Sequence, residues 1–149
     1  MQLTRQADYA VRVVLDLSVR PQRQSRTEEI ARRQRIPPAF LRKIVQTLAR
    51  AGFVRTVRGA DGGVRLVREP AATTLRQVIE AVEGPLRLNR CLIRRGECPL
   101  DRICPVHPVW QHIQEVMVRE LDAVTFAWLN ENRPAVGRGG TITEKGERS

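Results

Sequence analysis

Several features that define other protein classes are missing from this sequence of 149 residues. No apolar run approaches the roughly 18 residues that would suggest a membrane span, so we expect no membrane partner. The opening, MQLTRQADYAV, lacks the basic start and apolar block of a signal peptide, which favours a soluble, cytoplasmic protein. We also find no paired nucleophile and base, no phosphate-binding loop and no second cofactor motif. The sequence therefore argues against an enzyme, an electron carrier or a small-molecule substrate.

Positive charge is unevenly distributed along the chain, whose formal net charge is +10. Residues 1–70 hold 15 Arg or Lys against 6 Asp or Glu, a net charge of +9, whereas residues 71–132 hold 7 against 8. Such a concentration is typical of a protein that binds a polyanion, although an Arg-rich segment can also be a solvated surface. We expect the N-terminal half to bind double-stranded DNA.

Three amphipathic segments in the N-terminal half predict helices. Thr4 can cap the first, and Ser25 with Glu28 has capping-box spacing for a short second one. Two consecutive prolines precede a third helix with one apolar face, formed by Phe40, Leu41, Ile44, Val45 and Leu48. The second and third segments together predict a helix-turn-helix, whose second helix would enter a major groove. Its DNA-facing side chains would be Arg42, Lys43 and Gln46.

The stretch after this helix predicts a β-hairpin. FVRTV and VRLV are rich in β-branched residues and flank RGADGG, which is typical of a tight turn. A helix-turn-helix followed by such a hairpin is a winged helix, with a plain exposed turn as the simpler alternative. Arg58 at the base of the tip could enter a minor groove, and Gly59 would let the backbone approach the DNA closely.

Further helical segments follow the hairpin. Thr74 and Gln77 can cap a helix that Gly84 ends, and Thr125 can cap a short final helix. Between them, from Pro108 onward, apolar residues recur at spacings of three and four. This long helix is too apolar on one side to stand alone, so we expect it to form a homodimer, with packing inside one subunit as the alternative.

The fold class expected from these segments is mainly α-helical with a small β-wing. Four regions follow: a winged helix-turn-helix DNA-binding domain over residues 1–84, a cysteine loop over 85–107, a dimerisation helix and a short C-terminal helix over 108–132, and a disordered tail over 133–149.

The stretch NRCLIRRGECPLDRICPVHPVW contains all three cysteines of the protein, and they fall within a span of fourteen residues. Clustered thiols in a reducing compartment are more often ligands or redox groups than disulfides. Cys91, Cys98 and Cys104 are spaced widely enough to converge on one metal centre, and an iron-sulfur cluster fits them best. A structural zinc with His107 as fourth ligand remains an alternative, as does thiol oxidation without a metal.

The opening MQLTRQADYAV, the wing VRGADGGVRL and the three-cysteine loop together resemble the iron-sulfur winged-helix transcriptional regulators, the family that includes IscR and NsrR. The resemblance covers residues 1 to about 132. It implies a homodimeric regulator whose operator binding is controlled by a cluster that senses redox state, nitric oxide or iron. The alternative is a cluster-free winged-helix regulator that uses thiol oxidation or zinc at the same cysteines.

The resemblance implies that Cys91, Cys98 and Cys104 are the cluster ligands, and it leaves two candidates for the fourth. Asp8 matches the aspartate that NsrR-like members contribute from the partner subunit to a 4Fe-4S cluster. His107 matches the histidine that completes a 2Fe-2S cluster in IscR-like members. Asp8 could also simply favour a helix N-terminus, and His107 could simply begin a helix. We slightly favour Asp8 and 4Fe-4S, although the six-residue first gap is wider than in several members.

Overall fold

The computed structural model describes residues 2–134, which form helices and one small sheet. The α-helices and strands follow in the order α1 (Arg5–Ser18), β1 (Gln24–Ser25), α2 (Thr27–Gln34), α3 (Pro38–Arg50), β2 (Val54–Val57), β3 (Gly63–Leu66), α4 (Leu75–Glu83), α5 (His107–Ala123) and α6 (Phe126–Glu131). Short 3-10 turns are η1 (Pro21–Arg23), η2 (Pro70–Ala72) and η3 (Arg90–Leu92). The fold is mainly α-helical with a small β-wing, which confirms the predicted class. Of the predicted disordered tail, residues 135–149 lie outside the described residues.

Threonine caps begin three of the helices as the sequence predicts. The Thr4 hydroxyl accepts a hydrogen bond from the Ala7 amide (3.3 Å), and Thr125 accepts one from the Trp128 amide (3.1 Å). Thr74 forms a full capping box with Gln77. In each case the side chain satisfies an amide that the first helical turn leaves without a partner.

The capping box predicted at Ser25 is wrong. Helix α2 begins at Thr27, with Arg26 at the capping position and no side-chain cap. Ser25 instead lies in β1, and its hydroxyl donates to the Glu29 carboxylate (3.1 Å). Pairing of β1 with β3 takes this residue away from the helix start.

The sheet contains the predicted hairpin and one further strand. Its order is β1-β3-β2, and all neighbours are antiparallel. In the hairpin Val54 pairs with Leu66 and Val57 with Gly63, so the turn between them forms the wing. The added strand β1 connects the wing to the segment that leads into α2.

One apolar core joins helices α1–α4, the sheet and α6. Its fully buried members include Leu17, Ile30, Leu41, Leu48 and Phe126. Phe126 lies in α6, so the end of the described chain returns to pack with its beginning. We call residues 2–84 and 126–131 the winged-helix unit.

Phe40, which we expected in this core, is 42% exposed. Its ring lies edge-on to Tyr9 of α1, with centroids 6.2 Å apart. Position 40 therefore lies at the border of the apolar face of α3, outside the buried core.

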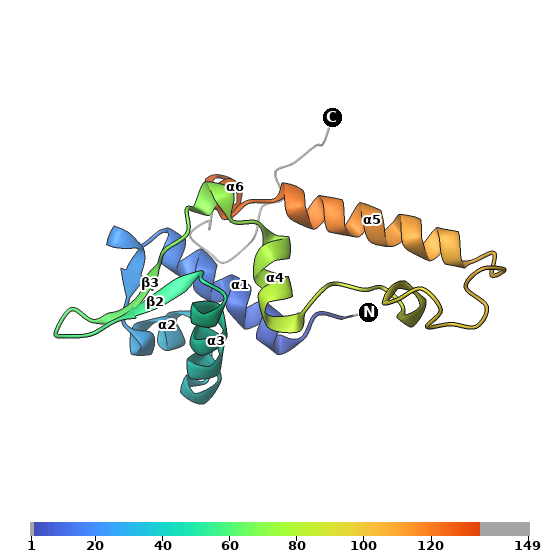
Figure 1. The fold of residues 1–149 in the computed structure, drawn as a ribbon. Coiled ribbons are helices and arrows are strands. Elements are labelled where there is room, and N and C mark those ends of the chain that lie inside the picture. Colours follow the sequence, from blue (N-terminus) through green and yellow to red (C-terminus); the bar gives the residue numbers. More distant parts are fainter. Residues whose placement is uncertain (1, 135–149) are drawn as a thin grey trace.

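Residues 85–123 form what we call the arm, made of the cysteine loop and α5. Figure 1 shows the arm extending away from the winged-helix unit on the side opposite the β2–β3 wing. The second half of α5 packs Met117 and Leu121 against a small cluster of Ala7, Ile79 and Leu86. None of the 17 residues of α5 is buried. No helix among residues 2–134 is long and apolar enough to cross a membrane.

Candidate functional site

Helix α3 divides its side chains between the core and solvent. Pro38 begins the helix, and Ile36 just before the two prolines is buried, which fixes the turn after α2. Leu41, Ile44, Val45 and Leu48 point inward as predicted. The three candidate DNA-reading residues, Arg42, Lys43 and Gln46, are all exposed and share the opposite face.

A buried carboxylate holds α2 against α1. The Asp16 side chain is fully buried and accepts hydrogen bonds from Arg33 (2.7 and 3.0 Å) and from the Gln34 amide (3.1 Å). Arg20 adds an ion pair at 3.2 Å. Burial alone would raise the pKa of Asp16, but the hydrogen bonds from Arg33 and Gln34 and the nearby positive charges outweigh it, so this pKa is lowered. The network sets the position of the first helix of the helix-turn-helix.

Arg68 connects the base of the wing to the end of α3. Its guanidinium stacks on the Phe53 ring at 4.0 Å and donates to the carbonyls of Ala51 (3.0 Å) and Gly52 (3.3 Å). The charge thereby satisfies two carbonyls just beyond the C-terminus of α3, where a cation also interacts favourably with the helix dipole. The wing and α3 are held in one fixed relation. At the far end of the hairpin Arg58 and Gly59 are exposed, and Gly59 has a φ of 109° that favours glycine.

The cysteine loop is organised by successive tight turns. The Asp101 amide donates to the Cys98 carbonyl (3.2 Å), and the Asp101 carboxylate accepts from the Gly96 amide (2.7 Å). The His107 amide then donates to the Cys104 carbonyl (3.3 Å). Cys98 thus lies one turn before Asp101, and Cys104 one turn before the start of α5. All three thiols are free and partly buried.

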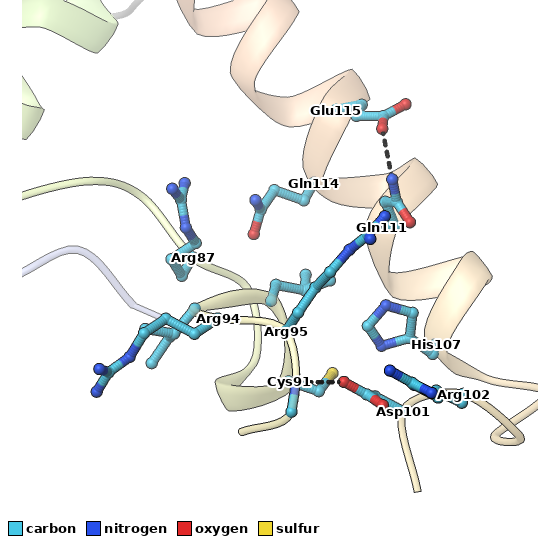
Figure 2. Close-up of a pocket in the computed structure, with 13 residues that line it drawn as sticks. Arg87, Cys91, Arg94, Arg95, Asp101, Arg102, His107, Gln111, Gln114 and Glu115 are labelled. Atoms are coloured by element: carbon cyan, nitrogen blue, oxygen red, sulfur yellow. Dashed lines mark hydrogen bonds between the residues drawn. The ribbon is translucent and has the colours of Figure 1, made fainter. Parts of the chain in front are cut away.

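A cavity of about 770 Å³ opens between this loop and the first turns of α5. Figure 2 shows it, with Cys91 and Asp101 on the loop and His107 and Gln111 on the helix. Its charged lining is Arg87, Arg94, Arg95, Arg102, Asp101 and Glu115. Guanidinium groups outnumber carboxylates, so the cavity favours an anionic occupant.

The imidazole of His107 lacks a hydrogen-bond partner. Its Nδ1 is buried, and no group among the described residues bonds to it. A buried unpaired nitrogen costs free energy, which is recovered when water, an ion or a ligand bonds to it. Cys91 lines the same cavity, whereas Cys98 and Cys104 do not. Across residues 2–134 the structure brings no three His, Cys, Asp or Glu side chains together as a metal site.

Asp8 lies elsewhere, in α1. Its carboxylate pairs with Arg12 at 2.9 Å, and it lines a separate groove with Leu3, Val11 and Leu121. The Arg12 guanidinium also reaches the carbonyl of Gln34 at the end of α2 (3.4 Å). Of the two candidate fourth ligands, only His107 shares a cavity with a cysteine of the same chain.

Comparison with known proteins decides the family. The sequence model of the Rrf2 family, described as an iron-dependent transcriptional regulator, matches residues 3–132. The chain belongs to the Rrf2 family. An NsrR transcriptional regulator from Geobacillus kaustophilus is 35% identical to this Rrf2 protein over 138 residues, covering 91% of this chain and 94% of the relative.

Two solved Rrf2-like structures share the fold at 25% identity. The B. subtilis global cysteine regulator CymR has a TM-score of 0.72, covering 88% of this chain and 97% of CymR. IscR from T. potens has a TM-score of 0.70, covering 89% and 88%. Membership of the Rrf2 family makes this chain a DNA-binding transcriptional regulator and not an enzyme, which confirms the resemblance seen in the sequence.

Three structural features of this Rrf2 protein were not predicted from the sequence: the Asp16 network, the Arg68 contacts and strand β1. The partners of Asp16 lie up to 18 residues away, and those of Arg68 up to 17 residues away. The sequence signal for the first was a charged residue, Asp16, on an otherwise apolar helical face. The signal for the second was an arginine, Arg68, shortly after a strand. Strand β1, two residues long, gave no periodic signal at all.

Proposed function

We propose that this Rrf2 regulator is a homodimer whose operator binding is controlled by an iron-sulfur cluster on the cysteine loop. In this proposal residues 1–84 read DNA, residues 85–107 hold the cluster and residues 108–132 join the two subunits. The observation that carries it is that Cys91 and the unpaired His107 nitrogen share an arginine-lined cavity, beside a loop that also holds the free, partly buried thiols of Cys98 and Cys104.

The donor set fits such a cluster. Thiolates bind iron, one position tolerates an imidazole or carboxylate, and the guanidinium groups would offset the negative charge of the bound group. Cys91, Cys98 and Cys104 would supply the three sulfur ligands. Cys98 and Cys104 lie outside the cavity that Cys91 lines, so cluster binding requires the loop to close. When bound, a cluster with one non-thiolate ligand would supply an iron that oxygen or nitric oxide can attack.

The fourth ligand would be Asp8 of the partner subunit in a 4Fe-4S cluster or His107 in a 2Fe-2S cluster. The position of Asp8 in α1, in a groove apart from the cysteines of its own chain, suits a ligand given to a second subunit. The likeness to NsrR also favours Asp8. The free Nδ1 of His107 and the likeness to IscR favour the histidine.

Asp8 also offers a route from the cysteine loop to the DNA-reading helices. Arg12 pairs with Asp8 and donates to the Gln34 carbonyl just before the turn that leads to α3. If Asp8 engages another group, Arg12 loses this partner and its hold on the α2–α3 turn changes. A ligand residue and the recognition helix would then be coupled through one arginine.

The dimer would form along α5. This helix exposes Val109 (52%) and Ile113 (41%), and Trp128 of α6 is 51% exposed. Exposed apolar side chains four positions apart on one helix suit an interaction surface. Symmetric regulators use such a surface to place two recognition helices about one duplex turn apart. Arg42, Lys43 and Gln46 would then read base edges, and the wing with Arg58 and Gly59 would enter a minor groove.

A cluster-free regulator that uses thiol oxidation is the second candidate. The likeness to CymR and the three free thiols of the loop favour it. A structural zinc at the same cysteines is the third possibility.

Metal analysis of anaerobically purified protein tests these proposals. We expect iron and acid-labile sulfide in the wild type and neither in Cys98→Ala, whereas Glu97→Ala, which removes an exposed side chain of the same loop, should retain both. Asp8→Ala should make the cluster more labile and leave the dimer intact, and His107→Ala should have little effect. The reverse result assigns the histidine and 2Fe-2S. Stoichiometric zinc without sulfide, or no metal at all, would contradict the cluster.

A further inference from the structure

The tip of the wing is bound to the segment that precedes α2. The Arg26 guanidinium donates to the Ala60 carbonyl (2.6 Å), and the Gln24 amide group donates to the Asp61 carbonyl. The other end of the Gln24 side chain accepts a hydrogen bond from Arg65 of β3 (3.0 Å). Two side chains from one short segment therefore hold two successive carbonyls of the tip.

The backbone of the wing is shaped for this contact. The Gly62 amide donates to the Gly59 carbonyl (3.0 Å) and closes the turn. A Cβ atom on Gly62 would lie 2.5 Å from the Val57 carbonyl oxygen, and one on Gly63 would collide with the Ser25 carbonyl. At Gly63 the hairpin approaches the Gln24–Arg26 segment as closely as only glycine allows, and at Gly62 the turn closes on its own backbone.

These contacts do little that the fold itself requires. Arg26 is exposed, and a solvent-exposed hydrogen bond contributes little to stability. Yet the segment leads directly into the first helix of the helix-turn-helix. Whatever holds the tip here also fixes Arg58 relative to α3.

We propose that Gln24 and Arg26 are positioning residues for DNA binding: they hold the wing tip in its DNA-binding shape before DNA arrives. A preordered tip saves the entropy that a mobile loop would lose on entering a groove. The role rests on the proposed contact between Arg58 and DNA, and it acts through the wing because the polar groups of Gln24 are already engaged by the protein.

A double-mutant cycle on the full-length protein tests this role, with a DNA duplex selected by the wild type from a random pool. Gln24→Ala should lower affinity by about 3- to 10-fold, which is the equivalent of one such hydrogen bond. It should lower affinity no further in an Arg58→Ala background, because both changes act through the same wing. Gln24 is uncharged, so the loss would not come from removing a positive charge that attracts the phosphates.

Hydrogen exchange of the DNA-free protein gives a second readout. Gln24→Ala should speed exchange of the Gly62 amide and leave the amides of α4 unchanged. Gln22→Ala is the matched control, since Gln22 also bonds to Arg65 (3.3 Å) but has no bond to the tip, and it should behave as wild type. Arg26→Lys retains a donor and should keep most of the affinity.

Four results would overturn the positioning role. Unchanged Gly62 exchange in Gln24→Ala would show that the tip needs no such support, and equal losses in both backgrounds would show that Gln24 acts outside the wing. If Arg58→Ala lowers affinity but Gln24→Ala does not, only the positioning role fails. If Arg58→Ala itself has no effect, the wing contact of the proposed function fails with it.

Discussion

The winged-helix unit and the arm differ in how completely they bury their apolar side chains. Helix α1 buries five apolar residues within 14 positions, whereas α5 is longer and buries none. Within residues 85–123 only Leu86 is buried. Buried apolar surface is the main source of folding free energy, so the two regions differ in what stabilises them.

This difference indicates that one region is structurally complete in a single chain and the other is not. The winged-helix unit has a closed core, a satisfied buried carboxylate and three helices capped by threonine. The arm has exposed apolar side chains, three unengaged thiols and an unpaired histidine nitrogen. What the arm lacks corresponds to what a second subunit and a bound group would supply.

The largest expected effect is a contrast between two isoleucines. Ile30→Ala, at a fully buried site in α2, should lower the free energy of unfolding by about 2–5 kcal/mol. Ile113→Ala, on exposed α5, should change the unfolding of an isolated chain by less than about 0.5 kcal/mol. Urea titrations at several protein concentrations measure both.

The same titrations test the proposed dimer, because association would make the unfolding midpoint depend on protein concentration. Ile113→Ala should reduce that dependence, while Ile30→Ala should retain it. Equal losses of stability at both positions in dilute protein would mean that α5 is already covered within one chain.

Asp16→Asn tests whether the buried carboxylate holds the winged-helix unit together. It removes a charged acceptor of several hydrogen bonds, so we expect a loss of about 1.5–3 kcal/mol at neutral pH. Because folding lowers the pKa of Asp16, its contribution is complete above its usual pKa of about 3.9 and is lost as the pH falls through the lowered folded value.

The stability difference between wild type and Asp16→Asn should therefore narrow below about pH 4. Urea unfolding at a series of pH values measures it. A difference that stays constant into strong acid would show that the wild-type carboxylate gains nothing from being ionised. Glu28→Gln, which changes an exposed carboxyl in α2, is the control.

The smallest expected effect is that of Arg42→Ala, which should weaken DNA binding without changing the metal content. Arg42→Ala should cost about 1–3 kcal/mol of binding at the selected site and relax preference at one base pair, because a guanidinium can pair bidentately with guanine. Its iron and sulfide content should match the wild type. Arg119→Ala removes the same charge from exposed α5 and should leave specific binding intact. If both substitutions lower the affinity for DNA equally, Arg42 contributes only its positive charge and does not recognise a base.

Local signals explain how much of the fold the sequence could predict. The caps at Thr4, Thr74 and Thr125 depend on residues three positions away, and all three were predicted correctly. The helix-turn-helix and the hairpin likewise follow from periodicity and turn residues within short windows. Ser25 was misassigned because its position depends on pairing with Val64, which lies 39 residues further along the chain.

In the candidate site, too, the sequence predicted features set by nearby residues and missed those set by distant ones. The exposed positions of Arg42, Lys43 and Gln46 follow from the helical period, so the sequence predicted this face. The support of the wing by Arg26 depends on a carbonyl 34 residues away, and neither composition nor spacing indicates which backbone oxygen a long side chain will reach. The grouping of the cysteines was visible at once, but the cavity that Cys91 shares with His107 depends on how the loop folds onto α5.

The return of Phe126 to the core has a consequence for the order of synthesis. Because this ring is fully buried in the same apolar core as side chains of α1, the core of the winged-helix unit is incomplete until α6 has been synthesised. By then the whole cysteine loop has already been made. A nascent chain that ends before residue 126 lacks this part of the core. The three cysteines precede residue 126, so every chain with a complete core also carries all three thiols.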